Sequence, residues 1–253
     1  MPDFSTDGIS LFYDDRGTGD MLLILPGNTA SSACHQAELN HFGKSYHAVS
    51  LDFRGTGKSG RMPQWPVDWW DRCTEDIASL LSHLGKKRCP VMGTSGGATI
   101  ALLFAIRYPD LVSGVIADST AEIYSPENLR KEVTERKRRI KEQVEFWSYA
   151  HGEDWETVVD ADSNLLLDLA DRGGDIFVGK LKTIRCPVLI TGSRKDSFIP
   201  DIAEQSESML RQIPDASVFL LDEGDHPLLW TCPDAFRAAS DRFLMALGRA
   251  DTE

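Results

Sequence analysis

Short apolar segments alternate with segments of helical periodicity along most of the chain. Residues 21–25 form a continuous apolar run, which is typical of a strand buried on both faces. In residues 67–84, apolar side chains recur at three- and four-residue spacing, which predicts an amphipathic helix. The strands predicted in this way are 11–14, 21–25, 47–53, 89–93, 111–117, 188–191 and 217–221, and the helices are 31–43, 67–84, 97–108, 201–212 and 233–247. This order predicts an α/β fold with a mostly parallel sheet covered by helices.

The alternation stops between residues 119 and 182, which are rich in helix formers and contain no convincing strand. Within this segment, residues 126–150 hold seven basic and five acidic side chains. Ligand sites in such sheets lie at the carboxyl ends of the strands. We therefore predict a helical cap at 119–182 above that edge, inserted in a core made of 1–118 and 183–253. The alternative is a solvated helical excursion with no role in substrate binding.

The net charge of the chain limits the kinds of molecule that it is expected to bind. The chain of 253 residues carries 27 Lys and Arg against 39 Asp and Glu, which gives a formal charge of −12. A chain of this size suits one large domain. Its negative charge disfavours nucleic acids and anionic membrane surfaces, because both bind mainly through basic side chains. We expect a small-molecule partner.

The location and the redox state can also be inferred. The apolar runs are shorter than the roughly 18 residues that a membrane span needs, and the residues from Met1 to Phe4 do not resemble a leader sequence. Five widely spaced cysteines without a Cys-x-x-Cys pair favour reduced thiols. These features predict a cytoplasmic protein, and the sequence gives no sign of its oligomeric state.

A glycine-rich segment at residues 55–60 fits G-x-G-x-x-G and contains Gly-Lys-Ser. A phosphate-binding loop requires a glycine five residues before Gly57, where Asp52 stands. Both nucleotide motifs also require a helix to begin at once, whereas residues 61–66 contain two prolines. We interpret the glycines as turn residues. Since no His, Cys or carboxylate cluster has metal-ligand spacing either, we predict no cofactor and no metal.

The sequence of residues 93–97, Gly-Thr-Ser-Gly-Gly, fits G-x-S-x-G between a predicted strand and a predicted helix. In that context the pattern indicates a sharp turn that lifts the hydroxyl of Ser95 above the sheet. At the start of the helix, the N–H of Gly96 can bind an oxyanion, and a second backbone N–H for the oxyanion is expected from the loop after strand 21–25. We therefore predict that Ser95 is a nucleophile and that the N–H groups of Asn28 and Gly96 form an oxyanion hole.

A serine nucleophile needs a base and a carboxylate that orients it. Of six histidines, His226 follows the last predicted strand, at the edge that also carries Ser95. Asp196 follows strand 188–191 at the same edge, and Asp118 at the end of strand 111–117 is the alternative acid. The order Ser, Asp, His favours Asp196.

With these motifs the chain resembles the α/β-hydrolase superfamily. The matching pieces are residues 25–27 and 52–59, the Ser95 turn, the Asp196 loop and the His226 loop. Residues 22–27, 68–72 and 178–187 are most similar to the valacyclovir hydrolase (biphenyl hydrolase-like) group. The resemblance implies the α/β-hydrolase fold, with a mostly parallel eight-stranded sheet flanked by helices and a small helical cap. It also implies a serine hydrolase of the carboxylesterase class (EC 3.1.1).

Members of this group cleave α-amino acid esters and carry an Asp directly after the nucleophile, which receives the ammonium group. Gly96 stands at that position here. Recognition of an amino group would then require another carboxylate, such as Glu122.

The sequence thus predicts hydrolysis of a small carboxylic ester through an acyl-enzyme, with Ser95 as nucleophile, His226 as base and Asp196 as the orienting acid. Two alternatives stay open. The same triad can serve C–C bond hydrolysis, lactone hydrolysis or perhydrolysis, because one fold hosts many reactions. The chain can also be a ligand-binding protein that retains a triad without turnover.

Overall fold

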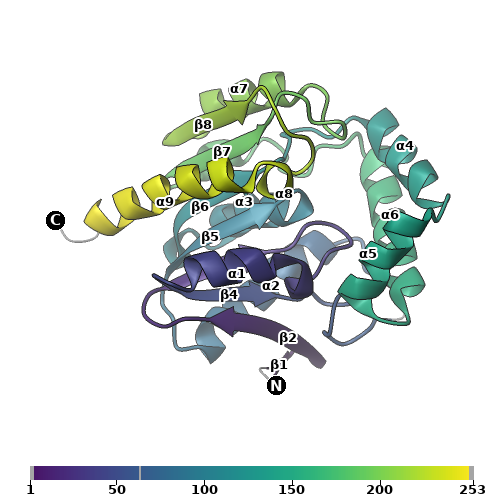
Figure 1. Cartoon of the computed structure of the whole chain (residues 1–253), viewed down its shortest axis with the longest axis horizontal. Coiled ribbons are helices and arrows are strands. Elements are labelled where there is room, and N and C mark those ends of the chain that lie inside the picture. Colours follow the sequence, from purple (N-terminus) through teal and green to yellow (C-terminus); the bar gives the residue numbers. More distant parts are fainter. Residues whose placement is uncertain (1–2, 63, 251–253) are drawn as a thin grey trace.

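An eight-stranded sheet forms the centre of the computed structural model, which describes residues 3–62 and 64–250 (Figure 1). The strands are β1 (Asp3–Thr6), β2 (Ile9–Arg16), β3 (Met21–Leu25), β4 (His47–Leu51), β5 (Cys89–Thr94), β6 (Val112–Asp118), β7 (Val188–Ser193) and β8 (Ala216–Leu221). Their order in the sheet is β1-β2-β4-β3-β5-β6-β7-β8. The pairs β1–β2 and β2–β4 are antiparallel, and all pairs from β4 to β8 are parallel.

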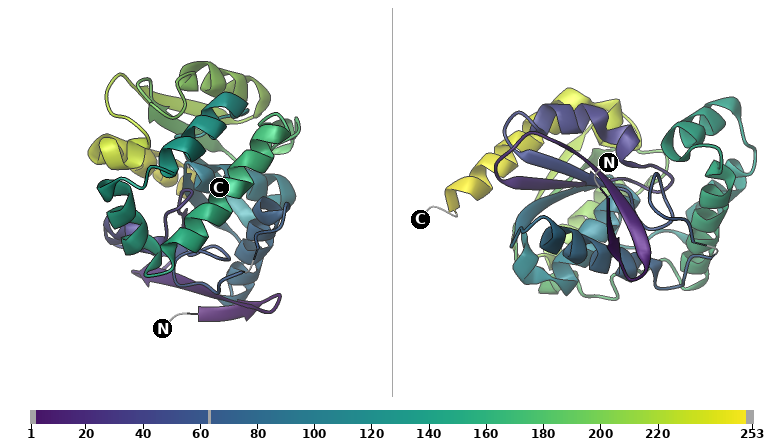
Figure 2. Two further views of the ribbon diagram at one scale, coloured as in Figure 1. Left: turned by 90° about the vertical axis from the view of Figure 1, so that its right-hand side faces the viewer. Right: turned by 90° about the horizontal axis from the view of Figure 1, so that it is seen from below.

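Helices cover both faces of this sheet (Figure 2). They are α1 (Gln36–Phe42), α2 (Trp69–His83), α3 (Gly96–Arg107), α4 (Pro126–Arg136), α5 (Lys141–His151), α6 (Trp155–Asp171), α7 (Ile202–Gln212), α8 (Leu228–Thr231) and α9 (Pro233–Ala250), with short 3₁₀ turns η1 (Ser32–His35), η2 (Pro109–Leu111) and η3 (Leu181–Thr183). Side chains of β3 alternate between the faces: Leu22 and Ile24 belong to the apolar cluster that includes side chains of α1 and α9, whereas Leu23 and Leu25 belong to the larger cluster on the other face, with side chains of α2, α3 and α7. The run 21–25 is therefore continuously apolar because both of its faces are buried.

The predicted α/β class and mostly parallel sheet are confirmed; strand 21–25 has the bounds predicted, and the other predicted strands occur with shifted ends. Strand β1 was not predicted, because only Phe4 of its four residues is buried. The predicted helix 31–43 consists of η1 followed by α1. Residues 1–2, 63 and 251–253 lie outside the described residues. Three predictions fall partly on these residues. They are the absence of a leader sequence at residues 1–4, the bounds of the core at residues 1 and 253, and the use of Pro63 as an argument against a nucleotide site.

Helices α4, α5 and α6 follow one another between β6 and β7 and lie together at one side of the sheet (Figure 1). We refer to these three helices as the cap. The cap packs against itself mainly through α4 and α6, and it faces the loops that leave the carboxyl ends of the strands. Among the described residues, none of the helices has the combination of length and apolar character that crossing a bilayer requires.

The glycine-rich segment after β4 is held by carboxylates. The carboxylate of Asp52 accepts hydrogen bonds from the N–H groups of Ser32 and Lys58, each at 2.7 Å. Gly57 has φ +51°, and a Cβ there would lie 2.0 Å from Asp52 Oδ2, so a side chain does not fit. Arg54 forms two hydrogen bonds with Asp76 of α2, at 2.7 and 2.6 Å. The segment is a turn fixed to its neighbours, as the sequence predicted.

The buried Arg54–Asp76 pair predicts a large loss of stability when one partner is removed. We expect Asp76→Asn to lower the free energy of unfolding by about 3–5 kcal/mol, since it removes the buried counter-charge of Arg54 and leaves only the exposed Asp7, 3.5 Å away. The measurement is urea unfolding followed by circular dichroism. Asp68→Asn, which weakens an exposed pair with Arg72 beside the same helix, is the control and is expected to cost less than about 1 kcal/mol. Equal effects of the two substitutions would contradict the prediction.

Candidate active site

Ser95 occupies a strained turn between β5 and α3. Its backbone has φ 52° and ψ −123°, a conformation that non-glycine residues rarely adopt. The turn is tight because a Cβ on Gly93 would lie 2.2 Å from the carbonyl oxygen of Gly97. A Cβ on Gly97 would likewise lie 2.3 Å from the carbonyl oxygen of Leu25 in β3. The small residues of the motif are therefore required by close backbone approach, as expected of a nucleophile turn.

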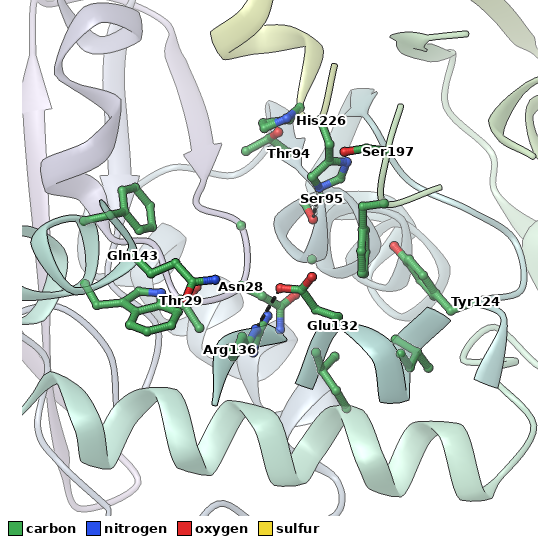
Figure 3. A pocket seen from close by; sticks show the side chains of 18 of the residues that line it. Asn28, Thr29, Thr94, Ser95, Tyr124, Glu132, Arg136, Gln143, Ser197 and His226 are labelled. Carbon is green, nitrogen blue, oxygen red and sulfur yellow. Dashed lines mark hydrogen bonds and ion pairs between the residues drawn. The ribbon is translucent and has the colours of Figure 1, made fainter. Parts of the chain in front are cut away.

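The loops after β7 and β8 bring a carboxylate and an imidazole to Ser95. His226 Nε2 lies 2.9 Å from Ser95 Oγ (Figure 3). His226 Nδ1 lies 2.8 Å from Asp196 Oδ2. A carboxylate only accepts hydrogen bonds, so the proton is on Nδ1 and Nε2 is free to accept from the serine hydroxyl. The structure thus brings together the three residues that the sequence predicted as nucleophile, base and orienting acid.

The carboxylate oxygen of Asp196 that does not bind His226 is also held by hydrogen bonds. This oxygen, Oδ1, accepts hydrogen bonds from the N–H groups of Phe198 and Ile199, at 2.9 and 2.7 Å. Asp225 ties this loop to the histidine loop, because its Oδ1 accepts from the N–H groups of Ser197 and His226, at 2.8 and 2.7 Å. The carboxylate and the imidazole are therefore held at a defined separation.

Asp118, the alternative acid, does not bind a histidine. Its carboxylate accepts hydrogen bonds from Thr94 (2.9 Å), Thr191 (2.7 Å) and the N–H of Leu229 (3.1 Å). Burial raises the pKa of Asp118 to about 6, although these hydrogen bonds oppose the rise. Asp118 links the ends of β5, β6 and β7 to the start of α8, and so connects the three segments that carry Ser95, Asp196 and His226.

Asn28 and Gly96, the predicted oxyanion donors, lie against each other. A Cβ built on Gly96 would be 3.3 Å from the backbone N of Asn28 and 1.7 Å from its Oδ1. Gly96 is the first residue of α3, where N–H groups lack intrahelical acceptors. Within the part of the chain that the structure describes, neither N–H donates a hydrogen bond to another protein group. Both donors are thus available to a ligand beside Ser95.

A cavity of about 450 Å³ opens between Ser95 and the cap, within the size range of small-molecule sites. The cap and nearby loops line it with apolar side chains, which are Tyr124, Leu129, Phe146, Trp147, Leu166, Leu169, Phe198 and Trp230. Glu132 and Arg136 of α4 lie together on the cap side of the cavity, opposite Ser95 and His226 (Figure 3). Among the described residues, no group of three or more potential ligands could hold a metal ion.

Sequence reasoning missed the polar chain in this cavity. Arg136 donates through Nε to Glu132 Oε1 at 3.0 Å and through Nη1 to Asp162 Oδ2. The second oxygen of Asp162 accepts from the side-chain amide of Asn28. The spacing of Glu132 and Arg136, four residues apart on a helix, was the available signal. Nothing in the sequence indicated that Asp162 would reach Asn28.

Glu122, the carboxylate that the sequence suggested as a substitute for an Asp at Gly96, is directed elsewhere. Its Oε1 accepts from Gln212 Nε2 at 2.5 Å, and Glu122 does not line the cavity. The carboxylates that do line it are Glu132 and Glu142. A carboxylate that meets a ligand in this cavity therefore comes from the cap helices.

Comparison with known proteins identifies the family to which the chain belongs. Residues 22–239 match the model of the Alpha/beta hydrolase family. Serine hydrolase BPHL of Homo sapiens is 27% identical over 253 residues, which cover 95% of this chain and 84% of that protein. A thermophilic esterase from Thermogutta terrifontis superposes with a TM-score of 0.74 at 23% identity, over 97% of each chain. An epoxide hydrolase from Bacillus megaterium superposes with a TM-score of 0.77 at 21% identity, over 96% of this chain and 99% of that one. With its sheet order, its serine turn and a family match that spans most of its length, this chain belongs to the alpha/beta hydrolase family.

Proposed function

We propose that this chain is a serine hydrolase that cleaves small carboxylic esters through an acyl-enzyme. The observation that carries the proposal is the continuous hydrogen-bonded path from Ser95 Oγ through His226 to Asp196, with contacts of 2.9 and 2.8 Å. A serine hydroxyl becomes a good nucleophile only when such a base can take its proton.

In this mechanism Ser95 Oγ attacks the ester carbonyl while His226 Nε2 takes the hydroxyl proton. The N–H groups of Asn28 and Gly96 stabilise the oxyanion, and Asp196 stabilises the imidazolium without itself becoming protonated. His226 then gives the proton to the departing alkoxide, which leaves as the alcohol. Water, activated by His226, attacks the acyl-enzyme, and the acid leaves as Ser95 regains its proton.

The proteins to which this chain is similar are named as hydrolases, which supports a hydrolase here, but their names refer to several different reactions. Among them are a serine hydrolase, putative carbamate hydrolases, epoxide hydrolases, a 2-(acetamidomethylene)succinate hydrolase, an esterase and an enol-lactonase. Ester cleavage is preferred because the cavity is mainly apolar and a complete serine–histidine–carboxylate set faces it. The full set also favours turnover over simple ligand binding, for which no base is needed.

The charges in the cavity favour a substrate with an ammonium group near the ester. Asp162, which is 1% exposed, neutralises Arg136, so Glu132 contributes a net negative charge to the wall opposite Ser95. The side chain of Glu132 is 33% exposed and can meet a ligand. A charge-assisted hydrogen bond to an ammonium group contributes about 1.5–3 kcal/mol. We propose that Glu132 takes the place of the carboxylate that is absent at Gly96.

The nucleophile assignment predicts that Ser95→Ala abolishes covalent labelling by a fluorophosphonate probe, because the probe reacts only with an activated hydroxyl. The measurement is intact-protein mass spectrometry, with circular dichroism to verify the fold. Ser197→Ala, which removes a hydroxyl that also lines the cavity, is the control and should be labelled as fast as the wild type. Labelling of the Ser95→Ala protein would reject the assignment.

The acid assignment predicts that Asp196→Asn lowers kcat for an aryl ester by roughly 10⁴-fold, because an amide no longer fixes the tautomer of the imidazole. Initial rates at saturating ester measure the effect. Asp222→Asn, at an exposed carboxylate in the histidine loop, should leave kcat within about twofold. If Asp196→Asn retained most of its activity, another carboxylate would have to orient His226.

The substrate preference predicts that an aryl ester with a free α-amino group is hydrolysed at least about tenfold faster than its N-acetylated counterpart, the ratio expected from one charge-assisted hydrogen bond. The measurement is kcat/KM for the two esters. Glu132→Gln should remove the preference, whereas Glu135→Gln, at a neighbouring α4 carboxylate outside the cavity, should retain it. Equal rates for the two esters in the wild type would instead indicate a general carboxylesterase.

A further inference from the structure

Residues 28–33, which run from the loop after β3 into η1 and include the predicted oxyanion donor Asn28, are contacted by the cap at four places. The four contacts are Asn28 Nδ2 to Asp162 Oδ1, His151 Nε2 to the carbonyl oxygen of Thr29 (3.0 Å), Ser31 Oγ to the carbonyl oxygen of Ala150 (2.8 Å) and Tyr149 Oη to the carbonyl oxygen of Ala33 (3.0 Å). On the core side, Asp52 holds the N–H of Ser32. Residues 28–33 are therefore clamped between the core and helices α5 and α6 of the cap.

Two of these contacts use polar side chains of the cap that are almost fully buried. Asp162 is 1% exposed and His151 is 5% exposed. Burying such groups is costly unless each finds a partner in a defined geometry. Asp162 binds both Arg136 and Asn28. The contacts therefore hold only when the cap is in the position that the structure shows.

His151 is suited to this place because it is neutral. Its Nδ1 accepts from the N–H of Gly57 at 2.9 Å, and its Nε2 donates to Thr29. Only a neutral imidazole can accept at one nitrogen and donate at the other. Burial lowers the pKa of His151 to about 4, so this form is present at neutral pH. His151 thereby joins the cap to the oxyanion loop and to the glycine-rich turn.

The side chain of Asn28 fills the space between Gly96 and Asp162. Its Oδ1 lies 1.7 Å from the position of a Cβ on Gly96, while its Nδ2 is bound to Asp162. One N–H of that amide is bound to Asp162 on the cap side, which leaves the backbone N–H of Asn28 as the group beside Gly96. The contact with Asp162 holds the side chain of residue 28, whose backbone carries this N–H.

We propose that the cap positions the oxyanion hole: Asp162, held by Arg136, anchors Asn28 so that its backbone N–H is directed at the developing oxyanion only when the cap is seated. This inference rests on the proposed function. Asp162 is a positioning residue, since it acts through Asn28 and does not touch the reacting atoms. The cap then contributes to kcat as well as to the choice of substrate.

The test compares Asn28→Ala and Asp162→Asn with the wild type. Asn28→Ala keeps the backbone N–H and the Arg136–Asp162 pair, so the fold is retained even if the Asp162 variant unfolds. Loss of one oxyanion donor costs about 10²–10³-fold in kcat. Because the donor is misdirected and not removed, we expect a fall of about 10- to 100-fold in kcat for the N-acetylated aryl ester. Its KM should change by less than about threefold, because this ester has no ammonium group to respond to the lost charge of Asp162. Asp160→Asn, at an exposed carboxylate on the same helix, is the matched control and should behave as the wild type.

A second readout separates positioning from general damage. Affinity for an aryl boronic acid, which forms a tetrahedral adduct with the serine, should fall in the same ratio as kcat/KM, whereas affinity for the carboxylic acid product should not change. The double variant should be no worse than the poorer single variant, because both remove one interaction. Unchanged kcat, or an equal loss of affinity for adduct and product, would overturn the inference alone. A wild-type chain that a fluorophosphonate does not label would overturn the proposed function as well.

Discussion

Close contact between backbone segments is the constraint on which this site depends. The turn that carries Ser95 can lie against the end of β3 only because no side chain stands at Gly97, where a Cβ would be 2.3 Å from the carbonyl oxygen of Leu25. The same packing brings the loop after β3 next to Gly96. Ser95 therefore lies beside Gly96 and the loop that carries Asn28, the two residues predicted to donate backbone N–H groups to an oxyanion, and such donors act most effectively when they are held in place before a ligand arrives.

Much of this arrangement could be predicted from the sequence, because it follows from parallel topology. Apolar runs such as 21–25 identify buried strands, and parallel strands place their following loops at one edge. Ser95, Asp196 and His226 each follow a strand and so meet there. Asp118 follows a strand as well; the order of the residues along the chain favours Asp196, and the hydrogen bonds of the structure separate the two, since Asp118 binds threonines and a backbone N–H, whereas Asp196 binds the histidine.

The cap side of the site could not be predicted, and the reason is physical. Asn28 and Asp162 are 134 positions apart and meet through the tilt of a helix over a loop, which no local pattern encodes. Glu122 was a reasonable candidate by charge, yet it faces Gln212. Strand β1 was missed for a different reason, since a short strand at the edge of a sheet buries too little surface to leave an apolar pattern.

The cap is encoded by one uninterrupted stretch between β6 and β7, and its last helix also holds the loop after β3. In chimaeras between relatives, exchange of that stretch replaces the cap side of the cavity without altering Ser95, His226 or Asp196. Under the proposal above, the incoming helices also have to supply partners for the loop after β3, among them an acceptor for the amide of Asn28. Compatibility between donor and recipient then depends on these few contacts with the core as well as on how the new helices pack with one another.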